Sequence, residues 1–126
     1  MFETIHSDVA PAAVGPYAQA IRAQGMLFTS GQIGLNPQTG KLIDDTLVGQ
    51  ANQVMGNLRA VLAAADCQLS DIVKVNIYLL DMADFPALNA LYADWLGEHR
   101  PARATVAVAA LPLGARVEMD VIARCV

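Results

Sequence analysis

The chain has 126 residues, 55% of them hydrophobic and 16% charged, and its formal net charge at pH 7 is −4. This length predicts a single domain, residues 1–126, and the apolar composition excludes an intrinsically disordered protein. The acidic balance, without any cluster of lysine and arginine, argues against nucleic acid as a partner. The low fraction of charged residues leaves too little polar surface for a small monomer. This indicates that part of the surface is buried against other subunits.

Cysteine and histidine are sparse. Cys67 and Cys125 are expected to be reduced, partly buried thiols, because no CxxC or Cys/His spacing suggests zinc. His6 and His99 lack a paired ligand motif, so no metal is expected. No apolar run reaches membrane-spanning length and the N-terminus lacks a basic signal region, so we expect a cytoplasmic protein without a membrane partner.

The first third of the chain predicts short strands. Glu3 to His6 is expected to be an edge strand, and the proline-rich residues 8–16 an irregular loop. Residues 17–23 and 26–30 predict a hairpin that turns at Gln24-Gly25.

A glycine-bearing loop follows this hairpin. Gly31 and Gly34 either let the backbone approach a ligand closely or simply allow the chain to turn, and the sequence favours neither. The spacing matches neither GxxxxGK[ST] nor GxGxxG, which excludes a phosphate loop.

Two helices flank a strand in the middle of the chain. Residues 46–65 carry an apolar stripe at helical spacing, and Gly56 within them indicates close packing on a sheet. Residues 72–80 are rich in β-branched side chains and predict a central strand. Residues 84–96 predict a second helix with an aromatic stripe, interpreted as core. The first stripe comprises Ala51, Met55, Leu58, Leu62 and Ala65, with Gln50, Gln53, Asn57 and Arg59 lying off it.

Residues 101–123 alternate in polarity and predict two strands joined by a tight turn at 111–114. The alternation predicts that Arg103, Thr105 and Glu118 share the polar face of this hairpin. On pattern alone, an exposed ion pair with Glu118 or Asp120 explains Arg103 better than a functional role does.

The expected order is strand–strand–strand–helix–strand–helix–strand–strand. Two helices with apolar stripes most economically cover one face of a single sheet. Subunit association is the obvious way to close the other face.

The whole chain resembles the RidA family, also called the YjgF-like family of enamine/imine deaminases. The matching segments are APAAVGPYAQA, FTSGQIGLNPQTGKL, SDIVKVNIYLLDMADFPALNALYADWL and, most specific of all, RPARATVAVAALPLGARVEMDVIA. The resemblance implies an α+β fold like that of chorismate mutase of the bacillus type, with a mixed β-sheet and two helices on one face. It also implies a homotrimer, in which the sheets form a central barrel and ligands bind in three intersubunit clefts.

The resemblance also assigns roles to residues. Arg103 matches the arginine that grips the substrate carboxylate, and Glu118 matches the glutamate that positions the attacking water. Thr105 stands where many members have cysteine. The remaining positions that match the lining of the same cleft are Tyr17, Ser30, Gly31, Ile33 and Asn89.

The implied reaction is hydrolysis of a 2-imino acid such as 2-iminobutanoate, or of its enamine tautomer such as 2-aminoacrylate, to a 2-keto acid and ammonia. No metal or other cofactor is required, because the iminium carbon is already electrophilic. Covalent catalysis through Thr105 is not expected, since no histidine or lysine base is nearby in sequence. The alternative is a non-catalytic small-carboxylate-binding or chaperone-like trimer. A ribonuclease fits poorly with the acidic charge.

Overall fold

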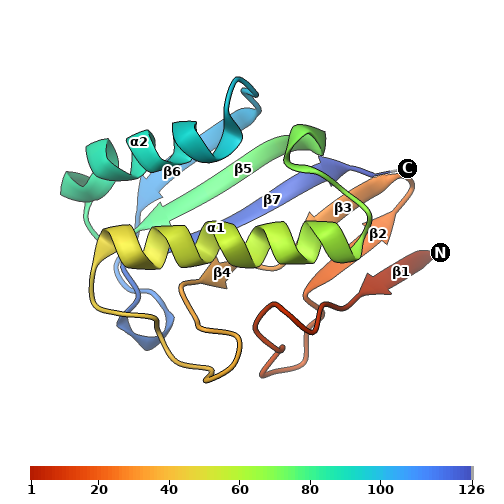
Figure 1. The fold of residues 1–126 in the computed structure, drawn as a ribbon, viewed down its shortest axis with the longest axis horizontal. Helices are drawn as coiled ribbons and strands as arrows, with labels where there is room; N and C mark the ends of the chain where they lie inside the picture. Colours follow the sequence, from red (N-terminus) through yellow and green to blue (C-terminus); the bar gives the residue numbers. More distant parts are fainter. Residues whose placement is uncertain (126) are drawn as a thin grey trace.

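The computed structural model describes residues 1–125, and these form one sheet with two long helices (Figure 1). A short strand, β4, is added to the expected order. The elements are β1 (Phe2–Ile5), β2 (Ala20–Ala23), β3 (Met26–Thr29), β4 (Gln32–Ile33), α1 (Leu47–Ala64), β5 (Ile72–Leu79), α2 (Phe85–Leu96), β6 (Ala102–Ala107) and β7 (Val117–Arg124). Short 3₁₀ turns occupy Leu69–Asp71, Met82–Asp84 and Pro112–Gly114.

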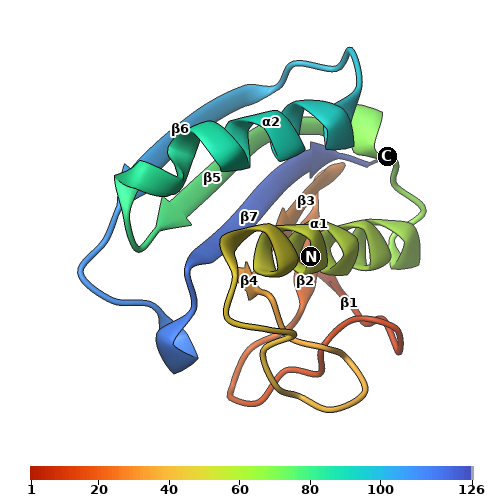
Figure 2. The ribbon, with the colours of Figure 1, turned by 60° about the vertical axis from the view of Figure 1, so that its left-hand side comes forward.

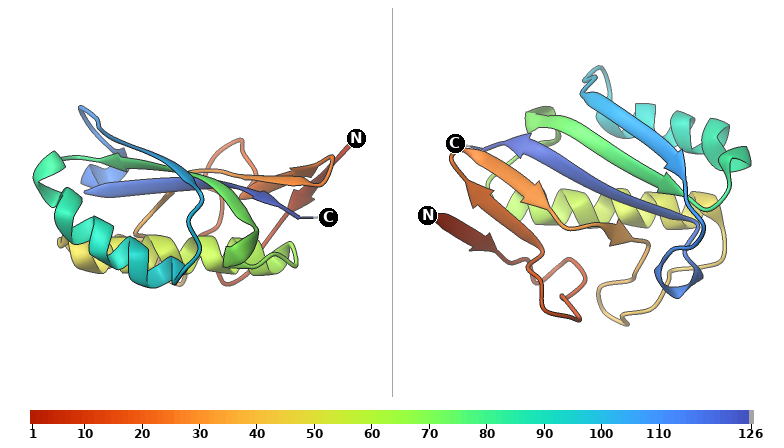
Figure 3. Two further views of the ribbon diagram at one scale, coloured as in Figure 1. Left: turned by 90° about the horizontal axis from the view of Figure 1, so that it is seen from above. Right: turned by 180° about the vertical axis from the view of Figure 1, so that it is seen from behind.

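Both helices cover the same face of the sheet, as expected, and leave the other face open (Figure 3). Helix α1 lies over β7, and α2 lies beside α1 on the β5–β6 side (Figures 1 and 2). The helix face holds the core, in which Val75, Ile77, Val117, Met119 and Val121 are at most 1% exposed. Within residues 1–125 no helix combines the length and apolarity needed to cross a bilayer.

The sheet order is β1-β2-β3-β7-β5-β6, with β4 also paired to β7. The hairpin expected at Gln24-Gly25 is confirmed, and both residues have positive φ. The hairpin predicted for residues 101–123 is wrong, although both of its strands form. Strand β5 lies between β6 and β7, pairing in parallel with β6 and antiparallel with β7. Strand β5, which is rich in β-branched side chains, thus lies inside the sheet between β6 and β7. Residues 108–116 connect β6 to β7 past the end of β5.

Helix α1 begins where predicted, because the Thr46 hydroxyl accepts a hydrogen bond from the Gly49 backbone N–H at 2.9 Å. Its predicted apolar stripe is buried. Two polar residues placed off that stripe, Gln50 and Asn57, are nevertheless only 1% exposed. Their amides bond loop backbone: Gln50 donates to Asp44 O and Asn57 donates to Leu35 O. Burial is tolerated here because these amide groups find partners.

Glycine packing differs from the expectation. Gly56 does not pack closely on the sheet, because a Cβ there would meet nothing within 4 Å. The close approach occurs at Gly34, where a Cβ would lie 2.8 Å from the Gln50 Cα. Gly34 therefore lets the loop after β4 contact the α1 backbone.

The expectation of two reduced cysteines is corrected. Cys67 and Cys125 are joined in a disulfide with a Cα–Cα distance of 5.7 Å. The pairing follows from the fold, because the end of β7 passes beside the connection between α1 and β5. Both cysteines are buried, as expected.

Candidate active site

Arg103 lies on the helix face of the sheet. It pairs in register with the buried Val75 of β5, so its side chain points toward α2. The Arg103 Nη1 donates to the Asn89 Oδ1 at 2.7 Å. Its guanidinium carbon lies 5.4 Å from the Phe85 ring centroid and 5.0 Å from that of Tyr92. One amide and two aromatic rings thus orient the guanidinium.

A pocket of about 520 Å³ opens beside this arginine. Two hydroxyls on this side of the sheet, those of Tyr92 and Thr105, are buried without a hydrogen-bond partner within residues 1–125. Burial raises the pKa of Tyr92, so its hydroxyl stays protonated at neutral pH. The pocket is lined by Asn89, Tyr92, Ala93, Arg100, Pro101 and Arg103.

Glu118 lies on the opposite, open face of the sheet. It pairs with Tyr78, while its neighbours Val117 and Met119 point into the core. Burial, followed by the negative charge of Asp120, raises the pKa of Glu118 above 4.5. The carboxyl group is therefore suited to exchanging protons nearer neutrality than an exposed glutamate.

A second, mostly apolar pocket of about 280 Å³ contains Glu118. Tyr17 lies on its rim and is half exposed. Ser30 is not among the lining residues, and its hydroxyl instead donates to Ala18 O at 2.6 Å, which holds the Tyr17 loop in place. The lining residues are Pro11, Ala12, Val14, Tyr17, Gly31, Gln32, Ile33, Leu35, Pro112, Leu113 and Glu118.

Gly31 has a further role beside the two alternatives that the sequence left open. A Cβ at residue 31 would collide with the Glu118 carboxylate, whose Cδ would be 2.9 Å away. The missing side chain makes room for the catalytic candidate.

The prediction that Arg103, Thr105 and Glu118 share one face is wrong. The register places Arg103 and Thr105 opposite Val75 and Ile77 on the helix face, and Glu118 opposite Tyr78 on the open face. The alternative of an ion pair between Arg103 and a nearby carboxylate also fails, since no ion pair within residues 1–125 includes Arg103. The candidate residues therefore divide into an arginine pocket lined also by Asn89, with Thr105 on the same sheet face, and a glutamate pocket lined by Tyr17, Gly31 and Ile33.

Sequence reasoning missed some residues that support these pockets. Gln19 is 3% exposed, donates to Pro11 O and accepts from the Ser7 N–H, and so fixes the loop that walls the glutamate pocket. Its partners lie 8 and 12 residues earlier in the sequence, so no local pattern marks it. Asp120 accepts a hydrogen bond from Asn76 at 2.8 Å, whereas the sequence suggested it only as a strand residue and an ion-pair partner of Arg103.

Neither pocket gathers three metal-ligating side chains within residues 1–125. The one such cluster in this part of the chain is Cys67, Asp71 and Cys125. It lies at the other end of β7 from Glu118, and its sulfurs are joined in the disulfide.

Comparison with known proteins places this fold and these residues in a family. The family model described as Endoribonuclease L-PSP matches residues 7–125. The chain belongs to this family, the YjgF/RidA family. It is 42% identical to the mouse protein named 2-iminobutanoate/2-iminopropanoate deaminase, covering 96% of this chain and 90% of the mouse protein. Reactive Intermediate Deaminase A of Arabidopsis thaliana is 44% identical, and the match covers 96% of this chain and 65% of the Arabidopsis protein.

Solved structures of the RidA family agree with the fold. The crystal structure of RidA from an Antarctic Psychrobacter superposes with a TM-score of 0.93 at 44% identity, covering 97% of this chain and 98% of that chain. The expected family and α+β fold are confirmed.

Proposed function

We propose that this RidA-family chain is an imine deaminase. It hydrolyses 2-imino acids such as 2-iminobutanoate, or their enamine tautomers, to 2-keto acids and ammonia. The proposal draws on the names of the mouse and Arabidopsis relatives and on the chemistry of the two pockets.

The observation that carries the proposal is the free guanidinium of Arg103. It is oriented by Asn89 and two aromatic rings, has no carboxylate partner within residues 1–125, and borders an open pocket. An arginine fork matches a carboxylate with two parallel hydrogen bonds. Arg103 would therefore bind the carboxylate of the imino acid, and the unpartnered Thr105 hydroxyl offers a further hydrogen bond.

Glu118 supplies the proton transfer. Its carboxylate accepts a proton from water as the water oxygen bonds to the imine carbon and the C=N electron pair moves to nitrogen, and it returns that proton to the nitrogen. In the resulting carbinolamine the carboxylate accepts the hydroxyl proton and passes it to the amino nitrogen as the C–N bond breaks, so ammonia leaves with a keto acid. The raised pKa of Glu118 suits both acceptance and return of the proton. Backbone groups of residues 31–33 would hold the substrate nitrogen.

The two pockets lie on opposite sheet faces, so one subunit does not complete this site. We infer a homotrimer in which the arginine pocket of one subunit meets the glutamate pocket of the next. The open sheet face supports this, because Phe28 and Val106 on it are 45% and 48% exposed. Burying such side chains favours association.

A coupled assay tests the activity. Threonine dehydratase generates the imino acid, and keto-acid formation is followed with and without the protein; acceleration is expected. Activity should also survive exhaustive EDTA treatment, since no step uses a metal. Tight 2-oxobutanoate binding without acceleration would instead support the alternative, a non-catalytic small-carboxylate-binding trimer.

A further inference from the structure

We propose that Cys67 and Cys125 form a reversible oxidation site, which exchanges with low-molecular-weight thiols and disulfides and locks the end of β7 to the connection after α1. The site is separate from both pockets described above. Along β7, Glu118 and Cys125 are seven residues apart, roughly 23 Å at the rise of an extended strand. The proposal therefore does not depend on the proposed deaminase activity.

Backbone contacts fix the position of each cysteine independently of the disulfide, and Ile72 pairs with Ala123 between the two segments that carry them. The Cys125 N–H donates to Gly25 O at 2.8 Å, and the Cys67 N–H donates to Leu62 O at 2.9 Å. The turn before Cys67 is made by Asp66, whose φ is +58°. Because these contacts need no S–S bond, the reduced cysteines stay adjacent and are ready to be oxidised again.

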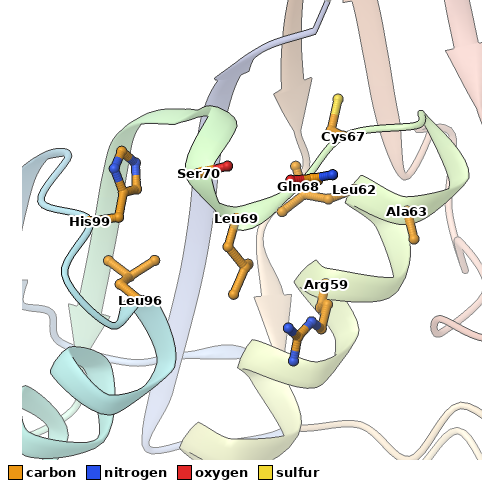
Figure 4. Close-up of a pocket in the computed structure, with 9 residues that line it drawn as sticks. All are labelled: Arg59, Leu62, Ala63, Cys67, Gln68, Leu69, Ser70, Leu96 and His99. Atoms are coloured by element: carbon orange, nitrogen blue, oxygen red, sulfur yellow. The ribbon is translucent and has the colours of Figure 1, made fainter.

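The pair lies beside a pocket that is large enough to admit a small thiol. Cys67 lines a surface pocket of about 420 Å³ between the end of α1, the 3₁₀ turn Leu69–Asp71 and the end of α2 (Figure 4). Arg59 lines the same pocket, so the carboxylates of glutathione meet its positive charge there. The Asp71 carboxylate, although close to both sulfurs, accepts from the Gln68 N–H at 2.7 Å and caps this turn.

Glutathione disulfide is the oxidant that converts the two cysteine thiols into the internal disulfide. The thiolate of Cys67 attacks one sulfur of glutathione disulfide and expels one glutathione thiolate. Cys125, as a thiolate, then attacks the Cys67 sulfur of the mixed disulfide and expels the second glutathione. The two cysteines together lose two protons and two electrons, and one glutathione disulfide becomes two glutathione molecules.

Oxidation closes a loop between residues 58 positions apart, which restricts the unfolded chain. The oxidised protein should melt at a temperature roughly 5–15 °C above the reduced protein. The disulfide also restrains the chain locally. Its reduction should speed amide hydrogen exchange in residues 62–72 and 123–125, and should leave the exchange rates of residues 117–119 unchanged.

The test uses the full chain, in which Cys67 and Cys125 are the only cysteines. Protein treated with glutathione disulfide and protein treated with dithiothreitol, both without denaturant, are compared by thiol titration, intact mass and thermal melting. We expect no free thiols with unchanged mass after oxidation, two thiols after reduction, and the difference in melting temperature. Cys125→Ser and Cys67→Ser should melt at the same temperature under both treatments.

Three results would overturn the proposal. One is a stable glutathione adduct in place of the internal bond, and another is a bond between subunits on a non-reducing gel. The third is recovery of thiols only after unfolding, which would make the cross-link a permanent structural one. Wild-type protein is compared in both states, so a variant that fails to fold does not affect the result.

Discussion

Arg103 and Glu118 lie on opposite faces of the same sheet, although both were expected on one polar face of a hairpin. Arg103 pairs with Val75 and faces α2, and Glu118 pairs with Tyr78 and faces the open side. The proposed deamination uses both side chains, so its substrate must contact two subunits.

The first prediction is subunit complementation. Arg103→Ala and Glu118→Gln should each be strongly impaired alone, but a co-refolded equal mixture should regain about a quarter of wild-type activity. Random mixing unites a native arginine pocket with a native glutamate pocket at one interface in four. Sedimentation equilibrium should give three times the 13.3 kDa chain mass for every sample. A monomer, or a trimer without recovery, would refute the shared site.

The second prediction separates binding from turnover. Arg103→Ala removes a charge-assisted contact, so the affinity for 2-oxobutanoate should fall by roughly 2 kcal/mol or more. Glu118→Gln keeps the size of the side chain but removes its proton transfer, so it should bind the keto acid normally while turnover falls by about 100-fold. Calorimetry beside the coupled assay measures both effects. Full turnover in Glu118→Gln would rule out Glu118 as the base.

The third prediction concerns pH. Turnover requires ionised Glu118, so activity should fall as the pH drops through its pKa, which lies above 4.5. The charge of Asp120 helps to raise this pKa, so Asp120→Asn should shift the acid limb of the pH–rate profile to lower pH. Asp94→Asn is the control. It makes the same change in charge on the exposed side of α2, and should leave the acid limb of the pH–rate profile unshifted. An unshifted limb in Asp120→Asn would exclude Glu118 as the titrating group.

The fourth prediction contrasts two glycines. Gly31→Ala should lower turnover at least tenfold, because the added methyl group displaces the Glu118 carboxylate. Gly56→Ala places its methyl group in open space within α1, and should raise the free energy of unfolding by about 0.5–1 kcal/mol without changing activity. Thermal melting and the coupled assay compare both with wild type. Normal turnover in Gly31→Ala would show that the close contact is unimportant.

The fifth prediction concerns Thr105. Its hydroxyl is buried beside the arginine pocket without a partner, so Thr105→Ala should keep much of the activity and lose only one hydrogen bond to the ligand. The coupled assay and 2-oxobutanoate calorimetry measure this. A loss as deep as that of Arg103→Ala would instead indicate a nucleophile.

Local sequence patterns were enough to predict most helices and strands of this protein. Hydrophobic periodicity located α1, β5 and α2, and the glycine turn located the β2–β3 hairpin, because these patterns depend on neighbours within a few residues. The motifs at residues 100–123 also pointed to the family and to Arg103 and Glu118. Local alternation does not record which strand lies next to which, so the 101–123 hairpin was predicted wrongly.

The directions of those side chains depend on tertiary structure. Insertion of β5 between β6 and β7 turned Arg103 toward the helices and left Glu118 on the open face. Tertiary packing also brought Cys67 to Cys125 across 58 residues, and buried Gln50 and Asn57, whose amides bond the backbone of Arg116 and Leu35. Each of these contacts joins segments far apart in the chain, and its energy depends on a partner that no local window of sequence contains.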